Sequence, residues 1–169
     1  MTFVVPFDGS RLAEAALVRA VEFSAVLEER VVAVTVIPNG NAEYARERGW
    51  LDDDEPFAMQ TVVSTVHTHV ADLAPAADFQ HEVVERYATS GTVANRLRDV
   101  AADLDASMVF VGSDDAGHLV TSISSVGSSV AADAGYDVAI IRHARPSKIG
   151  SLRDRSPHRR AKSDFYLPE

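Results

Sequence analysis

The sequence of 169 residues contains no cysteine, which excludes disulfide bonds, thiolate metal sites and cysteine nucleophiles. No apolar run approaches the roughly 20 residues that a membrane-spanning helix needs. Because the strand-like residues 2–5 come at the very start of the sequence, we expect no signal peptide. We therefore expect a soluble, cytoplasmic protein, and its length suits a single domain.

Lysine is absent from residues 1–142, where arginine is the only permanent cation. These residues hold nine basic and 22 acidic side chains, a net charge of −13, whereas residues 143–169 hold seven basic and three acidic side chains, a net charge of +4. Such an acidic body suits very high salt, where the screening length falls to about 3 Å. The composition favours a halophilic source, with an ordinary acidic cytosolic protein as the alternative.

The sequence also lacks the short signatures of several enzyme classes. It has no GxxxxGK phosphate loop, no dinucleotide-binding GxGxxG, no zinc-binding HExxH and no GxSxG nucleophile elbow. His67 and His69 are two residues apart, which places them on nearly opposite sides of a helix and argues against a paired metal site.

Short, continuous apolar runs rich in β-branched residues are typical of strands that are covered on both faces. They occur at 3–5, 31–37, 108–111 and 138–141, with a more mixed run at 79–87. Apolar residues at helical spacing lie between them, at 12–27, 59–73 and 93–104, and a last helix is expected after the serine-rich residues 121–129. Ser10 is the expected N-cap of the first helix, and residues 90–92 provide the turn and cap of the helix at 93–104. The alternation predicts an α/β fold with a five-stranded, doubly wound parallel sheet.

Two segments lie outside this alternation. Residues 38–56 contain a possible short helix near 43–48 and the single tryptophan, Trp50. They form either a lid over a site or a surface insertion with Trp50 packed against the body. After Arg142 the pattern stops, and the prolines and clustered charges of residues 143–169 predict a mobile basic tail.

Candidate binding residues lie at the carboxyl ends of three of the predicted strands. Asp8 follows the first strand and precedes a helix, Val36 lies near the end of the second, and Gly112 ends the fourth, ahead of the serine-rich residues 121–129. Ligands of doubly wound sheets bind outside the carboxyl ends of the strands, and glycine N–H groups and hydroxyls suit a phosphate. The pattern predicts a phosphate site, although turns and helix caps use the same residue types.

The segments VVPFDGSRLAEAAL, the VIP end of the second strand, VGSDDAG and VGSSVAADAGYDVAIIR occur in this order. Together they resemble the universal stress protein family over residues 3–142. The resemblance implies a Rossmann-like domain at residues 1–142 that acts in the stress response by binding ATP. In nucleotide-binding members a G-x2-G-x9-G motif followed by Ser or Thr holds the phosphates, and the strand-one aspartate lies near ribose and metal. The implied nucleotide-binding residues are Phe7, Asp8, Val36, Gly112, Gly117, Gly127, Ser128 and Ser129, with Mg²⁺ at Asp8.

The first spacer of that motif departs from the family pattern. Asp115 stands where the second glycine is expected, and Gly117 follows two residues later. Asp114 and Asp115 add negative charge, and no lysine or arginine lies between Gly112 and Ser129. The alternative function is therefore a homodimeric interaction protein of the same fold that binds no nucleotide.

The last strand would be an exposed edge in a monomer, which pairing with a second copy removes. The resemblance implies a homodimer through Val138, Ala139, Ile140 and Ile141, with coverage by the tail as the alternative. The acidic body repels polyanions, so we expect no nucleic-acid partner. Because no general base or nucleophile is evident beside Asp8, we expect a binding protein rather than an enzyme, with slow ATP hydrolysis left open.

Overall fold

The computed structural model describes residues 1–112 and 135–144 and has the predicted α/β architecture. Five parallel strands form one sheet in the order β3-β2-β1-β4-β5. The elements along the chain are β1 (Thr2–Pro6), α1 (Arg11–Leu27), β2 (Arg30–Pro38), α2 (Ala42–Glu47), α3 (Met59–Leu73), β3 (Asp78–Val84), α4 (Ser90–Asp103), β4 (Ala106–Gly112) and β5 (Asp137–Ile141). Among the described strands, β3 and β5 are the two edges of the sheet.

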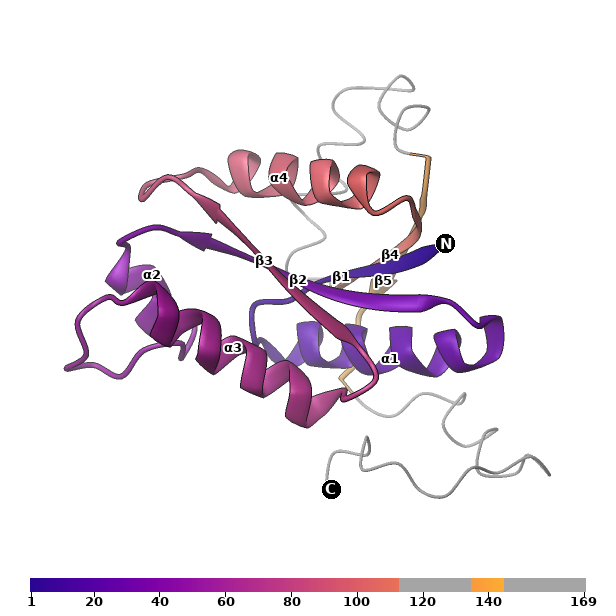
Figure 1. The fold of residues 1–169 in the computed structure, drawn as a ribbon, viewed down its shortest axis with the longest axis horizontal. Helices are drawn as coiled ribbons and strands as arrows, with labels where there is room; N and C mark the ends of the chain where they lie inside the picture. The colour runs from indigo at the N-terminus through magenta and orange to yellow at the C-terminus, as the bar shows by residue number, and fades with distance from the viewer. Residues whose placement is uncertain (113–134, 145–169) are drawn as a thin grey trace.

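Helices cover both faces of the sheet: α4 lies on one face, and α1 and α3 lie on the other (Figure 1). Successive side chains of a strand point to opposite faces. Phe3 and Val5 of β1 therefore pack into the core beneath α1 and α3, while Val4 packs into the core beneath α4. This burial on two faces explains why the strand sequences are continuously apolar.

The capping prediction is confirmed for α1 and is wrong by one residue for α4. Ser10 is the N-cap of α1, and its Oγ accepts the Ala13 N–H at 3.2 Å. In α4 the N-cap is Thr89, which precedes the predicted residues 90–92. The Thr89 hydroxyl accepts the Thr92 N–H at 3.2 Å, so the helix already begins at Ser90.

Two further predicted elements differ from the structure or fall outside its described part. The strand predicted at 79–87 ends at Val84, because the Ala88 N–H donates to the Glu85 carbonyl at 3.1 Å and closes a turn there. The helix expected after residues 121–129 lies outside the described residues, as does the tail from residue 145 onward. Within residues 1–112 and 135–144, no helix has the length and apolar character needed to cross a membrane.

Candidate functional site

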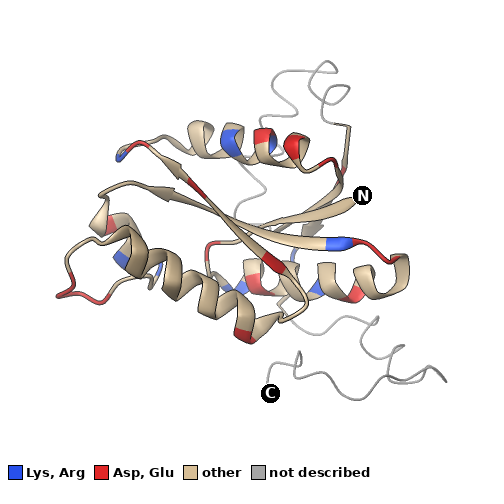
Figure 2. Cartoon of the chain, in the orientation of Figure 1, with Lys and Arg blue, Asp and Glu red and all other residues tan. Residues whose placement is uncertain are grey.

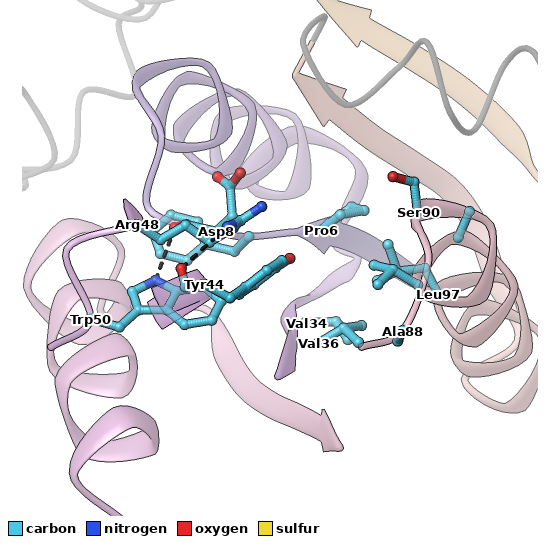
Figure 3. Close-up of a pocket in the computed structure, with 13 residues that line it drawn as sticks. Pro6, Asp8, Val34, Val36, Tyr44, Arg48, Trp50, Ala88, Ser90 and Leu97 are labelled. Carbon is cyan, nitrogen blue, oxygen red and sulfur yellow. Dashed lines mark hydrogen bonds between the residues drawn. The ribbon is translucent and has the colours of Figure 1, made fainter. Parts of the chain in front are cut away.

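A pocket of about 170 Å³ opens beyond the carboxyl ends of β1 and β2. Figure 3 shows one side formed by Asp8, Tyr44, Arg48 and Trp50, and the opposite side formed by Ser90, Leu97 and other residues of α4. The lining consists of Pro6, Phe7, Asp8, Val34, Val36, Tyr44, Arg48, Trp50, Ala88, Ser90, Val93, Ala94 and Leu97. The location agrees with the rule that ligands of open α/β sheets bind at the carboxyl ends of the strands.

The end of β1 is fixed by backbone and side-chain hydrogen bonds to β2. The Phe7 N–H donates to the Val34 carbonyl at 2.8 Å, and the Phe7 carbonyl accepts the Thr35 hydroxyl at 2.6 Å. Thr35 is 1% exposed, so this hydrogen bond is sheltered from water. Phe7 itself is buried and packs edge-on against the ring of His69, with 5.1 Å between ring centroids.

Asp8 is held at the rim of the pocket by the chain that leads into α1. One carboxylate oxygen accepts the Ser10 N–H at 2.8 Å, which places the acid directly ahead of the helix N-terminus. The Asp8 carbonyl accepts the indole N–H of Trp50 at 3.0 Å. Within the described residues no ion pair engages the Asp8 carboxylate, whose second oxygen stays available to a ligand.

Residues 38–56 contribute three side chains to the pocket. Asn41 caps the short helix α2 by accepting the Tyr44 N–H at 3.0 Å, and the Trp50 N–H donates to the Ala45 carbonyl at 2.8 Å. These bonds bring Tyr44, Arg48 and Trp50 to one wall. Trp50 is 4% exposed, and its ring lies 5.7 Å from the Tyr44 ring.

Trp50 stands out in the sequence as the single tryptophan, whereas Tyr44 and Arg48 were not predicted as site residues. The signal that could have found them is their spacing of four residues, which places an aromatic ring and a guanidinium on the same face of a helix. The opposite wall carries a similar signal, because Ser90, Val93, Ala94 and Leu97 follow helical spacing along one face of α4.

The predicted site residues fall into two groups. Phe7, Asp8 and Val36 all line the pocket, as a shared site requires. Gly112 ends β4 outside this lining, at a point where α1 packs closely against the strand. The remaining predicted positions, Gly117, Gly127, Ser128 and Ser129, lie outside the described residues, as do Asp114 and Asp115.

Gly112 has a packing reason to be glycine. A Cβ at this position would lie 2.9 Å from the Leu12 Cβ and 3.2 Å from the Ala13 backbone nitrogen. Real Cβ atoms essentially never show the first of these distances, so any larger residue would displace the start of α1. The absence of a side chain lets the N-terminus of α1 lie directly beside the end of β4.

Within residues 1–112 and 135–144, Asp8 is the one carboxylate that lines the pocket. In the described part of the chain, no group of three or more histidine, aspartate and glutamate residues could hold a metal ion. Mg²⁺ commonly uses one or two carboxylates together with waters and substrate phosphates. The single carboxylate therefore suits a Mg²⁺ ion that arrives with a phosphate ligand, and it does not form a metal site by itself.

Comparison with known proteins gives one family match. The model of the universal stress protein family matches residues 1–142. No curated protein sequence matches the chain significantly.

Several solved structures resemble this fold. A universal stress protein in complex with cAMP is 23% identical, with a TM-score of 0.45, over 86% of this chain and 98% of that one. A universal stress protein from Archaeoglobus fulgidus is 18% identical, with a TM-score of 0.48, over 84% of this chain and 93% of that one. The universal stress protein from Archaeoglobus fulgidus in complex with dAMP is 16% identical, with a TM-score of 0.43, over 83% of this chain and 95% of that one.

Proposed function

Because this chain belongs to the universal stress protein family, we propose that its pocket binds an adenine nucleotide and that the protein acts as a regulatory module in the cytoplasmic stress response. One observation carries the proposal: the pocket at the ends of β1 and β2 combines apolar side chains with a carboxylate at its rim. Ligand pockets are typically built in this way, with a few polar groups that fix the orientation of an otherwise apolar ligand.

The dimensions of the pocket suit a base rather than a whole nucleotide. Its volume of about 170 Å³ is close to the roughly 150 Å³ of an apolar cavity that accommodates benzene. Val34, Val36 and Leu97 supply apolar surface for a flat ring. By the family resemblance, the backbone near Val36 would hydrogen-bond the edge of the base. The sugar and phosphates then extend past Asp8, toward the carboxyl end of β4.

Asp8 serves the ribose or a Mg²⁺ ion in this arrangement. Its second carboxylate oxygen would accept a hydrogen bond from a ribose hydroxyl, or would help to hold a Mg²⁺ ion. By the family resemblance, Gly112, Gly117, Gly127, Ser128 and Ser129 hold the phosphates of ATP. Mg²⁺ would supply charge neutralisation for those phosphates beside Asp114 and Asp115.

Regulation, rather than turnover, is the role that these residues support. In the part of the lining that the structure describes, Asp8 is the one acidic side chain, and no histidine or lysine accompanies it. General acid–base catalysis needs a positioned group for each proton transfer. ATP hydrolysis by this site would therefore be slow, and nucleotide occupancy would act through the order of the surrounding segments.

A titration with adenosine, AMP and ATP, with and without Mg²⁺, tests the proposal. Trp50 is the only tryptophan and lines the pocket, so its fluorescence reports binding directly. We expect saturable binding that Asp8→Asn weakens about tenfold, through the loss of one charge-assisted hydrogen bond. Asp103 is an exposed acid at the C-terminal end of α4, whereas Ser90, at the N-terminal end, lines the pocket. Asp103→Asn is therefore the matched control and should bind the nucleotides like the wild type.

The opposite outcome favours the second function. The longer, aspartate-rich loop after Gly112 is the observation behind a homodimeric interaction protein that binds no nucleotide. If no adenosine, AMP or ATP binds across a range of KCl and Mg²⁺ concentrations, the nucleotide proposal is wrong and this alternative replaces it.

We also propose that two copies pair through β5. This strand is an edge of the described sheet, and unpaired edges are open to pairing with a second chain. Sedimentation should show a dimer for the wild type and a monomer for Ile140→Asp, which places two like charges at the interface. Val83→Asp, at the opposite edge strand β3, should remain dimeric. A wild-type protein that is monomeric at all concentrations would contradict this assignment.

A further inference from the structure

Among the described residues that line the pocket, Arg48 is the one with a cationic side chain. Its guanidinium carbon lies 3.2 Å from the centroid of the Tyr44 ring, and its Nη1 donates to the Tyr44 carbonyl at 3.2 Å. The Arg48 side chain is 29% exposed, so it is shielded without being sealed from the solvent. The ring and the carbonyl together hold the guanidinium in one place against the wall of the pocket (Figure 3).

Two nitrogens of the Arg48 guanidinium, Nε and Nη2, are free to donate hydrogen bonds to a ligand. Nη1 lies 3.9 Å from the exposed carboxylate of Glu47, which is a long contact. Within residues 1–112 and 135–144, Nε and Nη2 of Arg48 have no hydrogen-bond partner. Arg46 differs, because its Nη2 donates to the Glu55 carbonyl at 2.8 Å and ties the loop together. Nε and Nη2 lie on one edge of the guanidinium plane and form the fork that binds two oxygens of a phosphate.

The sequence indicates why a cation in the pocket wall would matter to a bound phosphate. Residues 113–129, which contain the phosphate-binding positions implied by the family resemblance, include no lysine or arginine and carry Asp114 and Asp115. A nucleotide phosphate therefore meets no positive side chain from that stretch. Arg48 belongs to a different part of the chain and lies on the same side of the pocket as Asp8 (Figure 3).

We infer that Arg48 determines the specificity of this site, by selecting adenine nucleotides that carry a phosphate over uncharged adenosine. The inference rests on the proposed function, since it concerns the same pocket. The base occupies the apolar part of the pocket and the ribose meets Asp8. The first phosphate then accepts two hydrogen bonds from Nε and Nη2 of Arg48.

Binding of adenosine and AMP to the wild type and to Arg48→Gln tests the inference. Glutamine keeps a planar group over Tyr44 but removes the charge and the fork. We expect Arg48→Gln to weaken AMP binding by roughly 10- to 100-fold, the range for hydrogen bonds to charged groups, and to leave adenosine binding unchanged. Arg48→Lys should recover only part of the loss, because an ammonium keeps the charge without the bidentate geometry.

Arg30→Gln is the matched control, because Arg30 is an exposed arginine at the amino end of β2, away from the pocket. It should bind both ligands like the wild type. An equal loss of adenosine and AMP binding in Arg48→Gln would show that Arg48 only packs against the pocket wall and does not bind the phosphate. An unchanged AMP affinity would show that Arg48 has no part in nucleotide binding. A wild type that binds neither adenosine, AMP nor ATP would instead overturn the proposed function itself, so the two failures are distinguishable.

Discussion

At the scale of single residues, Gly112 is a position where packing leaves no room for a side chain. Its missing side chain allows the start of α1 to approach β4, and an added Cβ would lie 2.9 Å from Leu12. We expect Gly112→Ala to lower the free energy of unfolding by about 1–3 kcal/mol, as other overpacking substitutions do. Urea unfolding followed by circular dichroism measures this change.

Gly91 is the matched glycine for that experiment. It lies in the first turn of α4, and a Cβ there would have its nearest contact 3.7 Å away at the Thr89 hydroxyl, an ordinary distance. Gly91→Ala should therefore stabilise the protein by about 0.4–1 kcal/mol, because alanine restricts the unfolded chain. Equal destabilisation by the two substitutions would show that the close approach at Gly112 is not responsible.

Tyr136 lies just before β5, and its phenol should make the stability of the protein depend on pH. Burial raises the pKa of its phenol above the ordinary value of 10.0, and the charge of Arg98 partly offsets this effect. The folded protein therefore holds the phenol proton more tightly than the unfolded chain. The resulting stability is complete below about pH 10 and is lost as the pH rises through the raised pKa.

Unfolding curves between pH 9 and 11 for the wild type and Tyr136→Phe measure this contribution. Phenylalanine cannot ionise, so the variant should lose less stability over this range. Tyr87→Phe is the control, because Tyr87 is 77% exposed and its replacement should leave the pH dependence unchanged. Identical slopes for the wild type and Tyr136→Phe would contradict the prediction.

At the scale of elements, the start of α1 connects the fold to the pocket. Ser10 caps the helix, and its N–H donates to Asp8, so one residue sets both the helix boundary and the position of the carboxylate. We expect Ser10→Ala to cost about 0.5–2 kcal/mol of stability through the lost cap. The backbone N–H remains in the variant, so the Asp8 contact should persist and nucleotide binding should fall little.

Thr65→Ala is the control for the cap. The Thr65 hydroxyl donates to the Thr61 carbonyl within α3, away from any helix terminus. Alanine is the better helix former, so this variant should be as stable as the wild type or slightly more stable. Thermal unfolding of both variants distinguishes a lost cap from a general effect of removing a hydroxyl.

At the scale of the whole molecule, the charge distribution predicts a response to salt. Acidic residues occur along the helices, the loops and β3 of the described part of the chain, with fewer arginines among them (Figure 2). Raising KCl from 0.1 to 1 M shortens the screening length from about 10 Å to about 3 Å and weakens the repulsion among these acids. We expect the midpoint of thermal unfolding to rise over this range.

A variant with less negative charge separates this effect from general salt stabilisation. The exposed residues Asp52, Asp53 and Asp54 lie together in one loop, and their replacement by asparagine changes the net charge from −9 to −6. Its unfolding midpoint should depend less steeply on KCl than that of the wild type. Parallel curves for the two proteins would assign the response to something other than charge repulsion.

The sequence by itself determined the order of the described elements, the parallel sheet and the cap at Ser10, because apolar periodicity and local hydrogen bonding act over neighbouring residues. It also marked Phe7 and Asp8, which follow β1, and Val36, near the end of β2; a doubly wound sheet brings such strand ends together.

Only the tertiary structure decided that Tyr44 and Arg48 join them in the pocket, and that Gly112 packs against Leu12. The 38–56 segment lacks a periodic signal strong enough to fix its path, and its position depends on contacts such as that of Trp50 with Asp8, 42 residues away in the chain. Contacts between residues so distant in sequence leave no local pattern, so they become visible only once the chain has folded.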